Sequence, residues 1–131
     1  MMSRAVFDVA AFDLKARAEA GAPLTLRHPK TGEPLPAVIW LQGEDAENYR
    51  RTLRAQIDRQ IMERKLELTA AEMEERLVER LAAITLKFEN IEKDGRPLEA
   101  SEETARALYR GHLWIREQVA AFVEERANFL P

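Results

Sequence analysis

The prolines of this 131-residue chain are concentrated in one short stretch, and their distribution constrains the fold more than any other feature. Four of the six lie between Pro23 and Pro36, and none occurs at residues 37–96 or 98–130. Because proline lacks a backbone donor and clashes with the preceding helical turn, long helices are confined to stretches without it. The two proline-free intervals therefore predict a mainly helical body.

Capping residues and apolar periodicity divide these intervals into helices. Asp13, Asp45 and Ser101 are suitable N-caps, and Thr69 with Glu72 matches a capping box, in which a hydroxyl and a carboxylate satisfy backbone N–H groups reciprocally. Behind each cap, apolar residues recur every third or fourth position. We expect helices over Asp13–Ala20, Asp45–Leu66, Ala70–Phe88, Glu102–Arg110 and Leu113–Ala127.

The proline-rich stretch carries two apolar runs with a turn between them. Leu24–Arg27 alternates apolar and polar residues, and Ala37–Leu41 is rich in β-forming residues, so a β-hairpin is predicted across Leu24–Leu41. A second turn is indicated by Asp94-Gly95. The predicted fold class is mainly α, a compact helical domain of about five helices with an N-terminal β-hairpin. We expect one domain over residues 1–131, with a short helix and hairpin at 13–42, a helical body at 44–127 and an apolar tail at 128–131.

The apolar stripes of the predicted helices indicate which side chains form the core. One stripe follows Tyr49 at four-residue spacing, and another follows Met73. The residues expected to be largely buried are Leu53, Ile57, Leu77, Leu81, Ile84, Leu108, Val119 and Phe122.

The residues needed for catalysis or metal binding are scarce in this sequence. The chain has no cysteine, which excludes a disulfide scaffold, a thiolate zinc site and a cysteine nucleophile. Its two histidines, His28 and His112, have no second metal ligand at helical spacing, and its carboxylates are interleaved with arginines. We expect no catalytic residues, no cofactor and no metal. No run approaches the ~18 apolar residues of a membrane span, so no membrane contact is expected.

One predicted helix is locally basic, although the net charge of the chain is −3. Between Arg50 and Lys65 there are six basic residues and only two acids. Such a helix could follow a phosphate backbone, but it has no interleaved aromatic residues on which bases could stack. A solvated or protein-contacting face is therefore favoured, and nucleic acid is not expected. The candidate contact residues on this helix are Arg50, Arg51 and Arg54.

The C-terminal part of the chain offers a second candidate surface. Trp114 is out of phase with the apolar stripe of its helix, and Phe129 and Leu130 belong to the terminal tail. These three side chains either fold back into the core or form an apolar contact surface for another protein. If they are exposed, we expect Trp114→Ala or deletion of residues 129–131 to weaken partner binding while the domain stays folded.

Four segments, in this order, resemble the tail assembly chaperones of long-tailed bacteriophages. They are FDLKARAEAGAPLTLRHPKTGEPLP, IWLQGEDAENYRRTLRAQ, FENIEKDGRPLEASEETARALY and LWIREQVAAFVEERANFL. The resemblance covers roughly residues 6–130. It departs from the family pattern at Phe88, where a tryptophan is expected before the Asp-Gly turn.

The resemblance implies a protein that is not an enzyme and that acts in tail morphogenesis. Such proteins coat the long, helical tape measure protein, keep it soluble and help to recruit tail tube subunits around it. The expected partners are therefore the tape measure protein and the tail tube protein, together with further copies of the chain in a possible homo-oligomer. The expected location is the cytoplasm of the bacterial host, and not the mature virion.

Two other functions remain open from the sequence. The first is a small nucleic-acid-binding regulator that uses the Arg50–Lys65 helix. The second is a structural tail or head-completion subunit that stays in the virion.

Overall fold

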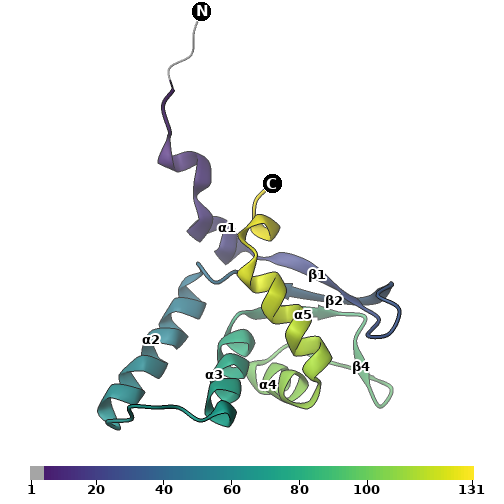
Figure 1. Ribbon diagram of the computed structural model, residues 1–131. Helices are drawn as coiled ribbons and strands as arrows, with labels where there is room; N and C mark the ends of the chain where they lie inside the picture. The colour runs from purple at the N-terminus through teal and green to yellow at the C-terminus, as the bar shows by residue number, and fades with distance from the viewer. Residues whose placement is uncertain (1–4) are drawn as a thin grey trace, which may run out of the picture.

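A three-stranded antiparallel sheet with helices on one face organises the protein (Figure 1). The computed structural model describes residues 5–131. The strand order is β1-β2-β3, and a separate small hairpin follows the sheet in the chain. The strands are β1 (Ala22–Arg27), β2 (Pro34–Leu41), β3 (Thr85–Glu89), β4 (Glu92–Lys93) and β5 (Arg96–Pro97).

Five α-helices and two short 3₁₀ helices make up the rest of the described fold. Thr69 and Glu72 form the predicted capping box at the start of α3, and the Asp13 and Ser101 side chains cap α1 and α4. The predicted cap Asp45 does not cap α2, because its carboxylate binds Arg126 instead. The helices are η1 (Val9–Phe12), α1 (Leu14–Ala20), α2 (Glu47–Met62), α3 (Ala70–Ala83), α4 (Glu102–Gly111), α5 (Leu113–Glu124) and η2 (Arg126–Phe129).

The prediction of a mainly α fold is wrong, because the chain forms a mixed α/β domain with two small antiparallel sheets. The predicted helix over Ala70–Phe88 ends at Ala83, and Thr85–Glu89 forms β3. Ile84 and Phe88 are four residues apart, so they imitate a helical stripe. In the structure Phe88 pairs with Ile39 of β2, which leaves β2 as the central strand of the sheet. The predicted hairpin across Leu24–Leu41 is confirmed.

The core lies between one face of the sheet and helices α3, α4 and α5. On that face Leu24, Ile39 and Phe88 stand side by side across the three strands. They pack against apolar side chains of the three helices, and the alternate residues of β2 point away from the core. Leu81 and Val119 are fully buried there, whereas Ile57 of α2 is 46% exposed, which makes its predicted burial wrong. Ile84 is buried, and Leu53, Leu77, Leu108 and Phe122 are half-buried.

Helix α2 packs on α3 largely through polar groups, which explains why part of its apolar stripe stays outside the core. The Gln56 side chain is buried, and its amide donates to the Arg76 carbonyl oxygen (2.9 Å). The same amide accepts a bond from the Arg80 guanidinium (2.8 Å). Because this buried polar group is fully hydrogen-bonded, it fixes the rotation of α2 against α3. Ile57 and Ile61 are consequently left on the surface.

The outer edge of β1 is covered at its last residue, Arg27, by a side chain of α5. The Arg27 N–H donates to Gln118 Oε1 (2.8 Å), and Gln118 Nε2 donates to the Arg27 carbonyl oxygen (2.9 Å). The side-chain amide of Gln118 therefore bonds to the edge strand as the backbone of a neighbouring strand would.

Candidate functional site

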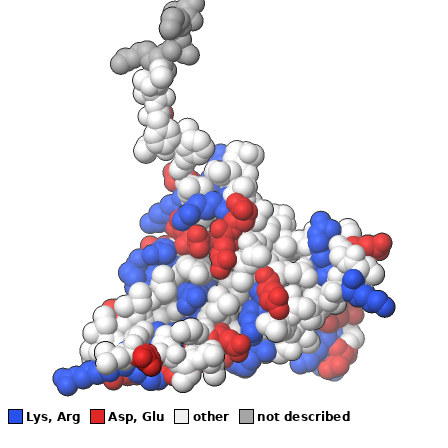
Figure 2. Space-filling view, in the orientation of Figure 1, with Lys and Arg blue, Asp and Glu red and all other residues white. Residues whose placement is uncertain are grey.

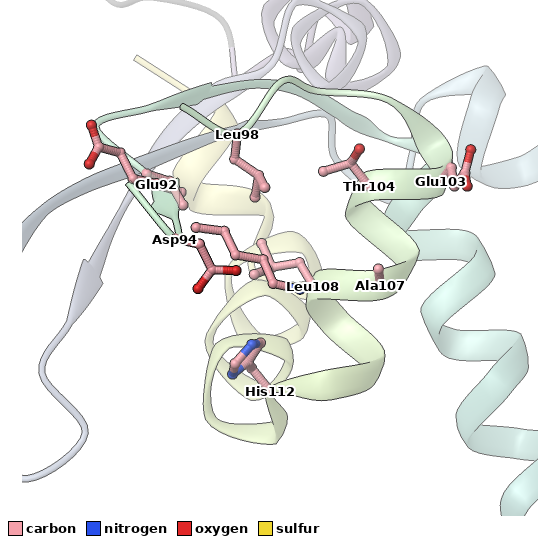
Figure 3. Close-up of a pocket in the computed structure, with 10 residues that line it drawn as sticks. Glu92, Asp94, Leu98, Glu103, Thr104, Ala107, Leu108 and His112 are labelled. Carbon is pink, nitrogen blue, oxygen red and sulfur yellow. The ribbon is translucent and has the colours of Figure 1, made fainter. Parts of the chain in front are cut away.

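A pocket of about 570 Å³ lies between the β4–β5 hairpin and helix α4 (Figure 3). The hairpin forms because Asp94 and Gly95 both adopt positive φ (53° and 79°), as a two-residue hairpin turn requires. Behind the turn, the Leu98 N–H donates to the Ile91 carbonyl oxygen (2.9 Å), which brings these two apolar residues together on one wall. Helix α4, which begins behind its Ser101 cap, supplies the opposite wall.

The pocket combines an apolar interior with an acidic rim. In Figure 3, Leu98 and Leu108 extend into the space between the hairpin and α4, and Ala107 lies beside them on the helix. Glu92, Asp94 and Glu103 contribute three carboxylates around it, against one cation, Lys93. An apolar side chain flanked by basic residues is therefore the chemistry that fits this pocket.

The structure places the predicted C-terminal contact residues largely against the core. Phe129 is only 8% exposed and packs edge-to-face on Phe122, with 5.6 Å between the ring centroids. Its ring also fills the space beside Gly43, where an added Cβ would lie 3.1 Å from two ring carbons. Trp114 is half-buried against the core, and Leu130 is half-buried beside Phe129. Of the two alternatives for this tail, the exposed one is wrong for Phe129.

The predicted basic residues of α2 lie on the surface, but their charges are partly neutralised. Arg50, Arg51 and Arg54 are exposed. Arg54 binds Glu47 (2.6 Å), and Arg51 donates to the Asn48 side chain (2.5 Å). Further along the run, Arg59 pairs with Glu79 and Lys65 with Glu72. Three of the six basic residues therefore already have carboxylate partners, which weakens the field available to a phosphate backbone.

Two apolar surfaces were not anticipated from the sequence. The first is the N-terminal arm, residues 5–12, in which Val6, Phe7, Val9 and Phe12 are exposed. The second is formed by α2, α3 and the connection between them, with Ile57, Ile61, Met62, Leu66 and Met73 exposed. The sequence did contain a sign that the arm would be exposed. Its four large apolar residues precede the Asp13 cap, so they cannot belong to the apolar stripe of α1.

The fold and pocket define a small mixed α/β domain with exposed apolar surfaces. Comparison of the chain with models of known families, with curated proteins and with solved structures finds no match. Over residues 5–131, no cluster of three or more His, Cys, Asp or Glu residues is placed to hold a metal ion. Within the same range, every helix is too short or too polar to cross a membrane.

Proposed function

We propose that this protein is a tail assembly chaperone of a long-tailed bacteriophage, which binds the tape measure protein and keeps it soluble while tail tube subunits are recruited. The role is one of protein binding without catalysis, in the cytoplasm of the bacterial host, and the protein is absent from the mature virion. The proposal rests on the resemblance of the four sequence segments to that family and on the surface of the molecule.

The observation that carries the proposal is the apolar pocket with an acidic rim between the β4–β5 hairpin and α4, on a molecule that leaves much apolar side chain on its surface. Eleven large apolar residues of the described chain are exposed, and nine of them fall in the two apolar surfaces defined above. Grouped apolar side chains on a small domain are typical of protein-binding surfaces. A tape measure chain that is not yet enclosed by its tube exposes long apolar helical faces, which a protein of this kind can cover.

We assign the contact with the tape measure protein to the pocket between the β4–β5 hairpin and α4. A helix that places a leucine or phenylalanine between lysines or arginines would bury the apolar side chain against Leu98 and Leu108. Its cations would then face Glu92, Asp94 and Glu103. Charges at the rim chiefly set orientation and association rate, and the apolar anchor supplies most of the affinity.

Co-expression with the tape measure protein tests the function. We expect the tape measure protein to be soluble and to co-purify with this chain, and to aggregate when it is expressed alone. A tape measure protein whose solubility does not depend on the chain would refute the chaperone proposal.

Filling the pocket tests where the contact lies. Ala107 is exposed on α4 and lines the pocket, so Ala107→Arg adds bulk and positive charge there without disturbing the core. We expect this variant to lose most of the co-purified tape measure protein. Ala121→Arg is the matched control, because Ala121 is an exposed helical alanine on α5. Equal recovery with both variants would move the contact elsewhere and leave the chaperone function standing.

The two other functions make different predictions in simple assays. A virion subunit would be found by mass spectrometry of purified particles, where we expect none of this protein. A nucleic-acid-binding regulator would show DNA affinity that falls steeply with salt and disappears in the Arg50/Arg51/Arg54→Ala variant.

A further inference from the structure

We propose that the N-terminal arm of one copy docks into a groove between α2 and α3 of a second copy, so that copies associate head to tail. This inference concerns the chain by itself and does not depend on the tape measure protein.

The arm is an apolar segment that stays exposed in the part of the chain that the structure describes, residues 5–131. Every residue from Ala5 to Asp13 is exposed, and the four large apolar side chains of the arm are each between 55% and 75% exposed. The arm nevertheless has a defined shape, because Asp8 caps η1 and the Phe7 ring stacks on Phe12 at 5.6 Å. Figure 2 shows the arm as an almost uncharged projection from a body whose visible face mixes both signs of charge. An ordered apolar projection of this kind is suited to insertion into another surface.

The groove between α2 and α3, the α2–α3 groove, is an apolar depression of about 310 Å³. Leu53, Ile57, Leu68 and Met73 form its apolar lining. Met73 is 58% exposed, although it belongs to the stripe that leads into the core. The volume is at the lower end for a binding pocket and suits one or two side chains of a docked segment.

Two arginines give the α2–α3 groove a positive rim. Arg76 donates to Gln60 Oε1 (3.1 Å), and Arg80 donates to Gln56 Oε1 and to the Tyr49 hydroxyl. All of these acceptors are neutral, and within residues 5–131 neither arginine forms an ion pair. The neighbouring carboxylate of Glu79 pairs with Arg59 instead (3.2 Å).

The arm carries the complementary charge. Between Ala5 and Leu14 the only charged residues are Asp8 and Asp13, and the nearest cations in the sequence are Arg4 before this stretch and Lys15 after it. Docking would therefore bring an acidic, apolar segment to a basic, apolar groove. Charge complementarity of this kind fixes orientation and disfavours like-charged partners, while the phenylalanines supply the buried area.

The geometry favours a second copy as the occupant. Figure 1 shows the arm leaving the body beside α1 and pointing away from the connection between α2 and α3. A docked pair leaves one arm and one groove free at its two ends. Such a contact between different surfaces continues into an open chain unless its rotation closes a ring.

Complementation between two variants tests the proposal directly. The arm variant is Phe7→Ser/Phe12→Ser, and the groove variant is Ile57→Glu/Met73→Glu, which sets carboxylates beside Arg76 and Arg80. All four replaced side chains are exposed, so both variants should keep the circular dichroism spectrum and melting temperature of the parent chain. Leu113→Glu is the control, because it places a carboxylate at an exposed apolar residue outside the α2–α3 groove.

Sedimentation velocity over a range of concentrations gives the readout. We expect the parent chain and the Leu113→Glu control to associate beyond the dimer, and each variant alone to associate at least ten-fold more weakly. An equimolar mixture of the two variants should form a heterodimer and nothing larger, because only one intact arm and one intact groove remain to pair. A monomeric parent chain, unchanged association of either variant, or a mixture that stays monomeric would overturn the proposal.

Disulfide trapping provides a second test, since the natural chain has no cysteine. A Val9→Cys chain mixed with a Met73→Cys chain should form a disulfide-linked heterodimer under mild oxidation. The mixture of Val9→Cys with Leu113→Cys should cross-link far more slowly. Equal cross-linking in the two mixtures would show random collision and refute the arm–groove contact.

Discussion

Replacing Phe129 with alanine tests whether the C-terminal tail belongs to the core of the folded protein. The ring is 8% exposed, lies against Phe122 and approaches the backbone at Gly43. Truncation to alanine removes the whole ring and leaves a space that Gly43, without a side chain, cannot fill.

The expected loss of stability follows from this packing. Phe→Ala at a buried site costs about 3–5 kcal/mol. Because the ring is not completely buried, with 8% of Phe129 exposed, we expect the lower part of that range, about 3 kcal/mol. The edge-to-face contact with Phe122 accounts for about 0.5–1.5 kcal/mol of it, which a double-mutant cycle with Phe122→Leu would isolate. A small domain is stable by only about 5–15 kcal/mol, so the effect is a large fraction of the total.

Urea unfolding followed by far-UV circular dichroism measures this change. The matched control is Phe12→Ala, since Phe12 is 55% exposed on the arm, and we expect it to stay within about 0.5 kcal/mol of the parent chain. A loss below about 1 kcal/mol for Phe129→Ala, at an unchanged denaturant slope, would refute the reasoning and place the ring on the surface in solution. Deletion of residues 129–131 is accordingly expected to destabilise the fold, as the alternative in which the tail folds back into the core predicts.

Two further predictions concern the core and the response to acid. Leu81→Ala should cost about 2–5 kcal/mol in urea unfolding because Leu81 is 1% exposed, whereas Leu66→Ala, at a residue 95% exposed, should leave the midpoint unchanged. Arg126 donates two hydrogen bonds to the Asp45 carboxylate (2.7 and 3.0 Å), and these hold the pKa of Asp45 below its usual value of 3.8. The ionised carboxylate therefore stabilises the fold above that value, and the contribution is lost as the pH falls through the lowered pKa. Thermal melts should show a small advantage of the parent chain over Asp45→Asn at pH 7 that disappears in strong acid.

Local signals in the sequence predicted much of the fold. The Thr69 capping box, the Ser101 cap and the Asp94-Gly95 turn each depend on residues within a few positions of one another, and all three are confirmed. β3 was missed because its identity depends on β2, which lies far earlier in the chain. From Ile84 to Phe88 the apolar residues fit both the spacing of a helix and the alternation of a strand. Only the pairing of this segment with β2 makes it a strand.

The candidate pocket and the exposed stripe of α2 could not be predicted for a related reason. The turn at Asp94 was visible in the sequence, but the pocket also needs Ala107 and Leu108 of a helix that packs beside it. The stripe containing Ile57 predicted burial, yet the buried amide of Gln56 fixes α2 so that Ile57 and Ile61 of that stripe face outward. A single polar residue that finds its partners in α3 thus outweighs the periodicity of its own helix.

The bonds between Gln118 and Arg27 also bear on how the chain is made. All three strands of the main sheet lie before residue 90, and α5 begins only at Leu113. During synthesis, which proceeds from the N-terminus, the sheet can therefore leave the ribosome before the residue that covers its outer edge. Until Gln118 emerges, the backbone of β1 at Arg27 is open to pairing with other nascent chains. Helix α5 thus closes, late in synthesis, a backbone edge that the N-terminal strand exposes early.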